Sequence, residues 1–200
     1  SLAYDTTNIF VVKCNAFGVK EWAKTFGGNG YDKARYVMQD NDSNIMVVGG
    51  THSSDGDITF TNGNGELFVL KLDPLGNKIW MEQFGGTGDE GGRMIQQLPS
   101  GDYLIAGYTT SHNFDVPFTQ GLHDGWLLKI DVDGNILWSQ TYGGTGEDRM
   151  RSFLETPDGG YLFFGSSGSN DVQLAGNHGG SDYWVGKVDS LGNHQWSRLY

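Results

Sequence analysis

The sequence has little cysteine, little basic charge and no long apolar run. Its 200 residues include one cysteine, Cys14, so no disulfide can form within one chain. Lys and Arg number 13 against 24 Asp and Glu, a formal net charge of −11. This balance argues against nucleic acid or an anionic membrane as a partner, because both need a basic surface. No apolar run is long enough to cross a bilayer and no signal-peptide pattern opens the chain, so we expect mature soluble material, from a chain that continues beyond these residues or stands alone.

Motifs for catalysis and metal binding are also missing. The five histidines show no ligand spacing, whereas a zinc site needs three or four converging ligands. No nucleophile motif is present. The run Gly85-Gly86-Thr87-Gly88 neither opens a helical pattern nor precedes a Lys-Ser/Thr pair, so it does not predict a phosphate-binding loop. We therefore predict a protein that is not an enzyme and that holds no cofactor.

One unit repeats through the chain at a period of 58 residues. The spacing links two series of residues: Lys13, Lys71, Lys129 and Lys187, and Trp22, Trp80, Trp138 and Trp196. Each unit contains four short runs rich in β-branched and aromatic residues, with no helical stretch at any phase. A period of this kind dictates the architecture. We divide the chain into a half unit at 1–26, with the third and fourth strands, and whole units at 27–84, 85–142 and 143–200.

Glycines and polar loops separate the strands within each unit. A glycine hinge, Gly85-Gly86-Thr87-Gly88 in the second whole unit, lets the chain pass from the last strand of one unit to the first strand of the next. Gly76 and its equivalents fit tight hairpins between the third and fourth strands. Long polar loops follow the second strand of each unit, at 52–65, 110–123 and 168–181.

The repeated residues resemble a known family. Val47-Val48-Gly49-Gly50 followed by an Asp-x-x-Gly-Asn-x-x-Trp hairpin, as at 73–80, resembles the kelch-type β-propeller blade. The Gly-Asn-x-x-Trp and Asp-Gly-Gly-Tyr signatures resemble tandem repeats of large secreted bacterial surface proteins. The resemblance implies an all-β β-propeller fold of four-stranded blades, about three and a half in this chain. It also implies a scaffold or adhesive surface at an extracellular or cell-surface location.

Charged residues recur with the same 58-residue period as the hinges. The acidic positions are Asp32, Glu90 and Asp148 after the hinges, and Glu66, Asp124 and Asp182 before the third strands. The arginines with that period are Arg35, Arg93 and Arg151. A catalytic site needs one asymmetric set, whereas these residues occur in every copy. We therefore favour structural hydrogen bonds and Arg–carboxylate pairs over a carboxylate cluster for Ca²⁺ or for acid–base chemistry.

Two loop sequences partly match known motifs, and each lacks a feature that the motif requires. Residues 131–135, Asp-Val-Asp-Gly-Asn, resemble the start of a calcium loop but lack the closing Glu, so a hairpin turn is favoured and calcium is the alternative. Residues 53–60 partly resemble the Asp-box of sialidases, with the glycine one place early. We interpret them as a polar loop that caps its own backbone.

Apolar repeat positions predict the core. Cys14 matches Leu72, Ile130 and Val188 in the other copies, so we expect a buried small hydrophobe. The periodic tryptophans are expected to pack between blades. Trp126 and Trp184 match Phe10 and Phe68, so all four are expected in an aromatic core slot.

The function predicted from these features is non-catalytic binding or adhesion through variable rim loops. The candidate contact residues in the loops are Asp57, Phe60, His112, Phe114, Asp115, Phe118 and His123, because loops on a rigid scaffold carry function. The ligand would be a protein or a carbohydrate. An alternative is self-association through open blade edges into an oligomer or filament. A glycan-active propeller enzyme is the lower alternative.

Overall fold

The computed structural model describes residues 7–59 and 61–200, and in that part of the chain all regular structure is β-strand. The strands are β1 (Ile9–Cys14), β2 (Lys20–Phe26), β3 (Asp32–Gln39), β4 (Ile45–Thr51), β5 (Glu66–Leu72), β6 (Lys78–Phe84), β7 (Glu90–Gln97), β8 (Tyr103–Thr109), β9 (Asp124–Ile130), β10 (Ile136–Tyr142), β11 (Asp148–Glu155), β12 (Tyr161–Ser167), β13 (Asp182–Val188) and β14 (His194–Leu199).

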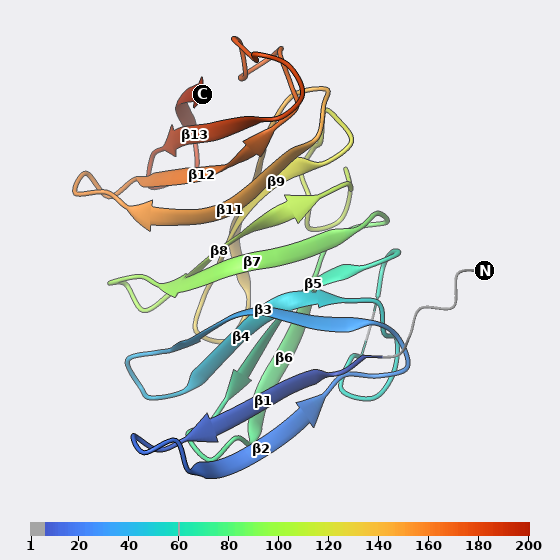
Figure 1. Cartoon of the computed structure of the whole chain (residues 1–200), viewed down its shortest axis with the longest axis vertical. Helices are drawn as coiled ribbons and strands as arrows, with labels where there is room; N and C mark the ends of the chain where they lie inside the picture. The colour runs from blue at the N-terminus through green and yellow to red at the C-terminus, as the bar shows by residue number, and fades with distance from the viewer. Residues whose placement is uncertain (1–6, 60) are drawn as a thin grey trace.

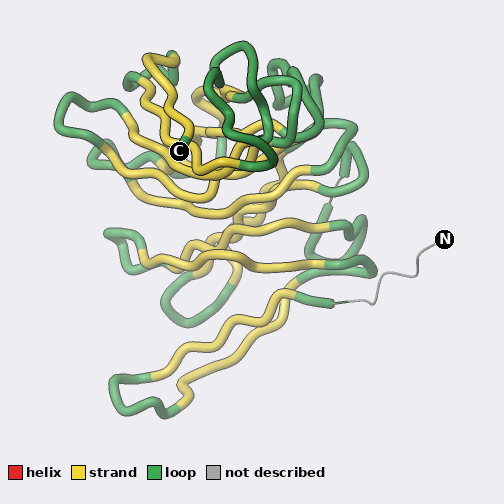
Figure 2. Tube along the Cα trace, turned by 45° about the horizontal axis from the view of Figure 1, so that its top comes forward, coloured by secondary structure: helices red, strands yellow, loops and turns green. Residues whose placement is uncertain are grey.

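The strands form one two-stranded sheet and three four-stranded sheets, all antiparallel. The orders are β1-β2, β3-β4-β5-β6, β7-β8-β9-β10 and β11-β12-β13-β14, so within each sheet the strands lie in the order of the sequence. The sheets are stacked along the long axis of the molecule, with β1 and β2 at one end and β11–β13 at the other (Figure 1). Loops gather at the two ends of the strands (Figure 2). The prediction of an all-β chain built from repeated four-stranded antiparallel sheets is confirmed.

The hydrophobic core lies between successive sheets rather than inside any one of them. One buried cluster joins β3–β6 to β7–β10 through side chains such as Val48, Leu67, Ile105 and Trp126. A second joins β7–β10 to β11–β14, and a third joins β1–β2 to β3–β6. Each sheet therefore depends on its neighbours for burial, as expected of a repeat architecture.

The periodic tryptophans pack against the hairpin of the next unit. A side chain on Gly76 would touch the Trp22 ring at 3.0 Å, and one on Gly192 would touch the Trp138 ring at 3.1 Å. A side chain on Gly134 would lie 3.9 Å from the Trp80 ring. Packing between units is thus confirmed for these three residues, while Trp196 is 39% exposed.

The periodic lysines tie each sheet together. Lys71 pairs with Asp40 at 3.8 Å and Lys129 with Asp102 at 3.0 Å, and Lys187 pairs with Asp158. In each case the acid lies in the turn between the first two strands of the same sheet. Lys71 also donates to the carbonyl of Val132 in the next hairpin, so this position links both strands and units.

Two core predictions are wrong, and both concern the half unit. Cys14 is exposed, whereas its equivalent Leu72 is fully buried. Phe10 is 65% exposed, whereas Phe68 at the same phase is fully buried. The cause is local: β5 pairs with β4 on one side and β6 on the other, whereas β1 pairs only with β2 among the described strands. Residues at the phase of a core slot stay exposed where no described strand lies in the place that the second strand takes in the whole units.

Candidate functional site

The acids after the glycine hinges bind hinge backbone rather than arginine. Gly28 N–H donates to Asp32 Oδ2 at 3.0 Å, and Gly86 N–H donates to Glu90 Oε2 at 2.8 Å. In the third whole unit, Gly144 N–H donates to Asp148 Oδ2 at 2.7 Å. The prediction of a structural hydrogen bond made once per unit is confirmed at these hinges.

The long loops supply the other acceptors for the hinges. Ser111 Oγ accepts from Gly88 N–H at 2.7 Å, and Asn113 Oδ1 accepts from Thr87 N–H at 3.0 Å. The same two contacts recur from Ser53 and Asp55 in the first loop and from Ser169 and Asp171 in the third. The loop at 53–59 therefore caps the hinge and not chiefly its own backbone, which corrects the self-capping prediction. We call these contacts the hinge staple.

The hairpin turns use their own carboxylates as caps. Asp131 Oδ1 accepts from the N–H groups of Asp133 and Asn135, and Asp131 Oδ2 accepts from the Asn135 side chain. Asp73 and Asp189 make the same contacts. These hydrogen bonds hold the pKa of Asp131 below its usual range. The favoured hairpin interpretation of 131–135 is confirmed.

Buried carboxylates meet in pairs at the junctions between sheets. A side chain on Gly85 would overlap both Glu66 Oε2 and Glu90 Oε2, and Glu66 Oε2 has no hydrogen-bond partner. Burial raises the pKa of Glu66 to about 7, and the neighbouring Glu90 carboxylate adds to the rise. Burial likewise raises the pKa of Asp124 to about 6, with Asp148 contributing. No group of three or more His, Cys, Asp or Glu arranged to hold a metal ion occurs among the described residues.

The arginines lie at β-bulges of the first strands. Arg35 is the extra residue in β3, between the pairs Ala34–Gly49 and Tyr36–Val48. Arg93 in β7 and Arg151 in β11 occupy the equivalent bulges. None of the three makes an ion pair within residues 7–59 and 61–200. The predicted Arg–carboxylate pairing is wrong, because the acids are used by the hinges and the bulge sets the arginine outside the strand ladder.

The first strands bring these arginines together. β3, β7 and β11 lie one above another (Figure 1). Burial lowers the pKa of Arg93, and the positive charges of Arg35, Arg151 and Arg149 lower it further. We call Arg35, Arg93, Arg149 and Arg151 the arginine row.

Tyr108 lies at the centre of the arginine row. The guanidinium carbons of Arg93 and Arg149 lie 5.1 Å and 5.0 Å from its ring centroid, within the range of cation–π contact. The His123 ring packs on Tyr108 with centroids 5.4 Å apart, and His123 Nε2 lies 3.2 Å from an Arg149 nitrogen. The sequence analysis did not predict this cluster. A signal for it was present, because in every whole unit an arginine follows the acid after the hinge by three residues.

A small cavity of about 130 Å³ lies between β3 and β7, beside the arginine row. Its lining includes Lys33, Arg35, Arg93 and Tyr108. A second hollow, beside β11, is lined by Arg149 and Arg151. In both hollows the basic side chains outnumber the acidic ones, which are Asp89 and Glu90 in the first and Glu147 in the second.

The predicted loop contact residues divide into two groups. Asp57 and Asp115 accept hydrogen bonds from Gly27 and Gly85 N–H at 3.3 Å and 3.1 Å, and His123 packs inward on Tyr108, so these three contact the scaffold. The exposed group is His112, Phe114 and Phe118. Phe60 lies outside the described residues.

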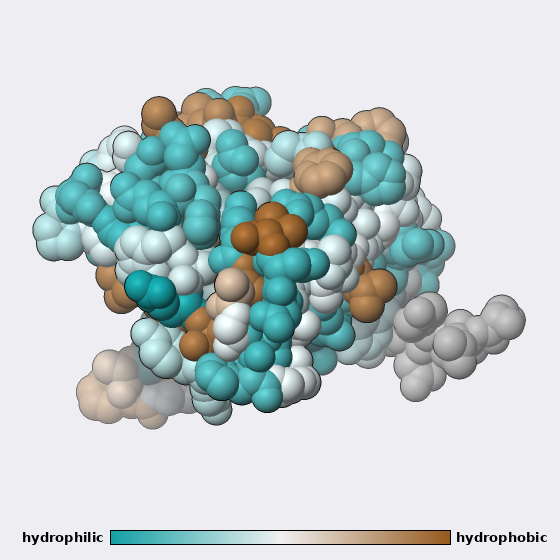
Figure 3. Space-filling view, turned by 90° about the horizontal axis from the view of Figure 1, so that it is seen from above, coloured by the Kyte–Doolittle hydropathy of each residue, from teal (hydrophilic) through white to brown (hydrophobic). Residues whose placement is uncertain are grey.

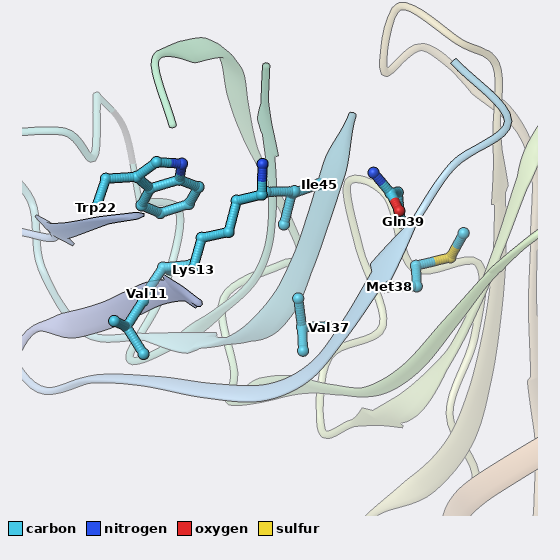
Figure 4. Close-up of a pocket in the computed structure, with 8 residues that line it drawn as sticks. Val11, Lys13, Trp22, Val37, Met38, Gln39 and Ile45 are labelled. Atoms are coloured by element: carbon cyan, nitrogen blue, oxygen red, sulfur yellow. The ribbon is translucent and has the colours of Figure 1, made fainter. Parts of the chain in front are cut away.

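An apolar groove runs along the open side of β1. It has two hollows, of about 560 Å³ and 310 Å³, between β1 and the strands β3 and β4. The second of these is lined by Val11, Trp22, Val37 and Ile45, and the Lys13 side chain extends between Trp22 and Ile45 (Figure 4). In the whole units, the first and second strands occupy the equivalent place beside the third strand.

No family model matches the chain, and no curated protein matches it. Two of the solved structures that resemble it are the following. A protein of unknown function from Bacteroides caccae is 14% identical, with a TM-score of 0.42, over 94% of this chain and 73% of that one. A Trp149Ala mutant of the Synechocystis apocarotenoid oxygenase is 10% identical, with a TM-score of 0.46, over 98% of this chain and 45% of that one. No helix in the described residues is long and apolar enough to cross a membrane.

The oxygenase corrects the prediction that the chain is not an enzyme. A chain to which this fold is similar is an enzyme, so the absence of a catalytic motif and an all-β stack of sheets do not exclude catalysis. At this identity and TM-score, the likeness assigns no reaction to this chain.

Proposed function

We propose that the chain is a secreted or cell-surface binding scaffold of the β-propeller type, with kelch-like blades, that contacts its ligand through the tips of its long loops. The observation that carries the proposal concerns Gly56, Phe114 and Val172, which occupy one position of the three loops. All three have left-handed backbone, with φ of 70°, 57° and 54°. Left-handed backbone suits glycine and is strained for phenylalanine and valine.

The side chains at this strained position point to a role outside the fold. Phe114 is 68% exposed and Val172 is 61% exposed. Two residues further on, Ile58, Val116 and Leu174 are each 1% exposed and anchor the loops. The base of each loop is thus constant and buried, whereas the tip differs between copies and carries exposed apolar side chains at a conformational cost. Strained, exposed residues on a rigid base favour ligand contact.

The experiment compares binding and stability in the same variants. The labelled protein is applied to an array of defined glycans and to immobilised extracellular-matrix proteins. Phe114→Gly relieves the strained backbone, so we expect its melting temperature to equal or exceed that of the wild type while binding is lost. Phe17→Ser changes a phenylalanine that is 91% exposed in the β1–β2 hairpin and should keep binding. Failure of the wild type to bind any probe, or equal loss in both variants, would contradict the proposal.

A second candidate function is self-association, and the groove beside β1 favours it. Phe10, Val12 and Val37 are 65%, 47% and 59% exposed there, and the open edge of β1 offers unpaired backbone groups to another strand. The other end of the stack shows hydrophobic residues as separate patches among hydrophilic ones (Figure 3). Light scattering over a range of concentrations should show a species larger than 21.9 kDa that Val37→Lys dissociates. A monomer at every concentration would contradict it.

A further inference from the structure

The distribution of arginine in this chain is uneven. It has five arginines, of which Arg35, Arg93, Arg149 and Arg151 lie on the first strands of the whole units, and only Arg198 lies elsewhere. The protein as a whole is acidic. Like charges placed together raise the free energy of the folded state unless an opposite charge balances them. Four guanidinium groups gathered on adjacent strands therefore call for an explanation beyond solubility.

The backbone of the first strands serves to present these groups. Arg35, Arg93 and Arg151 each occupy the bulge of an otherwise regular strand pair. A bulge disrupts the ladder locally and re-aims a side chain, and such features concentrate beside functional sites. The same bulge occurs at the same phase in all three sheets, so its effect is repeated along the row.

Part of the hydrogen-bonding capacity of the arginine row is not used within the protein. The Nε atoms of Arg93 and Arg149 are buried and have no hydrogen-bond partner. Arg149 pairs with Glu147 at 2.9 Å, but Arg35, Arg93 and Arg151 have no carboxylate partner among the described residues. A buried donor without an acceptor is costly, and an acceptor supplied by a ligand removes that cost.

The nearby acids are committed to other groups. Glu90 lines the cavity between β3 and β7, but its carboxylate accepts from Gly86 N–H and from the Thr109 hydroxyl. The Asp89 carboxylate accepts from the Tyr108 hydroxyl at 3.4 Å and lies 3.6 Å from His52 Nε2. Neither acid neutralises Arg35 or Arg93.

The floor of this cavity is kept open by glycine. Gly91 takes the place that Lys33 and Arg149 hold in the other units. A side chain on Gly91 would meet the Tyr108 ring at 2.8 Å. The missing side chain thus leaves room for Tyr108, which supports Arg93 and Arg149 from one side and leaves the cavity beside Lys33 and Arg35 unfilled.

We propose that the arginine row binds a small ligand through an oxyanion group, a carboxylate or a phosphate, seated in the cavity between β3 and β7. Guanidinium groups bind both anions through paired hydrogen bonds, and a cavity of about 130 Å³ accommodates one such group with its near neighbours. The Arg149–Arg151 hollow beside it would take a second charged group of the same ligand. This site is separate from the loop tips and does not depend on their function.

The test is isothermal titration of the full chain with two probes, inorganic phosphate and citrate, at constant ionic strength. We expect saturable binding of at least one probe by the wild type. Arg35→Gln and Arg93→Gln should each weaken it about tenfold or more, the usual effect of losing a charged hydrogen bond. Arg198→Gln, which changes an exposed arginine on β14, is the matched control and should stay within about twofold.

Each outcome decides the proposal. Preference for citrate assigns a carboxylate ligand, and preference for phosphate assigns a phosphate. Absence of saturable binding to both probes, or equal weakening in Arg198→Gln, would overturn it. Because Arg93 is partly buried and packs on Tyr108, Arg93→Gln is checked by circular dichroism. Arg35 is exposed, so Arg35→Gln keeps the proposal testable if the Arg93 variant fails to fold.

Discussion

At the scale of single residues, Glu66 and Glu90 face each other across Gly85 in the junction between the first two whole sheets. Both are 1% exposed, and burial raises the pKa of each. A carboxyl group whose pKa is raised by folding binds its proton more tightly in the folded state. Its contribution to stability is present below the unfolded pKa and is lost as the pH rises through the folded value.

We predict that stability falls as the pH rises from about 4.5 to about 7, the interval between the usual and the folded pKa of Glu66. Asp124 acts in the same direction up to about 6. Burial lowers the pKa of His123 and His194 below 6.5, so these two groups act in the opposite direction and reduce the net loss. The loss of unfolding free energy from the carboxyl groups is on the order of 1–3 kcal/mol. Carboxylates with lowered pKa, such as Asp73, act only below their usual 3.8. Thermal melting across this pH range measures the effect.

Glu66→Gln isolates the contribution of this pair. The glutamine oxygen can keep the bonds from Asn62 and Gly63 N–H, and its amide can donate toward Glu90. We expect a higher melting temperature than the wild type near pH 8 and a weaker pH dependence. Glu155→Gln, at the end of β11, should leave the pH dependence unchanged. A steeper pH dependence in Glu66→Gln would refute the assignment.

Gly85 provides a second residue-scale prediction. A side chain there would overlap the carboxylates of Glu66 and Glu90, so Gly85→Ala forces two buried groups apart and should cost about 1–3 kcal/mol of unfolding free energy. Gly168→Ala is the control, because its new methyl group would meet nothing closer than 3.5 Å. Chemical denaturation compares the two. Similar midpoints for both variants would contradict the packing described at this hinge.

At the scale of elements, the strands and turns are the part of the structure that the sequence predicts best. The 58-residue period places the same four strands in each unit because side chains at one phase meet the same neighbours. It fails at Cys14 and Phe10, where β1 lacks the neighbours that cover Leu72 and Phe68. A periodic pattern records what a position requires in a whole unit, and the expectation for Cys14 and Phe10 carried that requirement over to a unit with two described strands.

The arginine row shows a different limit. Alternation along a strand assumes a regular ladder, and the bulges at Arg35, Arg93 and Arg151 break it. Acids and arginines that recur at the same period then suggest Arg–carboxylate ion pairs, which the bulged strands do not form. The contact between Arg149 and Tyr108 could not be predicted from the sequence either, because the two residues belong to different sheets. The contact also depends on Gly91, since a larger residue there would meet the Tyr108 ring.

The hinge staple can be tested as an element. Ser111 is 1% exposed, and its hydroxyl accepts from Gly88 N–H at 2.7 Å. Ser111→Ala leaves that N–H without an acceptor, at a cost of about 1–3 kcal/mol. Ser190→Ala, in an exposed hairpin turn, should change stability by less than about 0.5 kcal/mol. Equal effects measured by denaturant unfolding would show that the staple does not hold the hinge.

At the scale of the whole molecule, each sheet buries its faces against the sheets before and after it. The folding stability of each sheet therefore depends on its neighbours in the stack. The long loops are attached to the sheets by the repeated contacts of the hinge staple. This arrangement separates two tasks. The repeated hinges, hairpins and core positions maintain the scaffold, and we propose that the loop tips and the arginine row bind ligands.

The most direct test of this division is amide hydrogen exchange along the chain. We predict that the hinge amides of Gly28, Gly86 and Gly144 exchange as slowly as amides in the central strands β4, β8 and β12. The amides of Phe114, Phe118 and Val172, whose side chains are exposed in the long loops, should exchange much faster. Hinge amides that exchange as fast as the tips would contradict it, because the loops would then lack the rigid base on which the proposed binding surface depends.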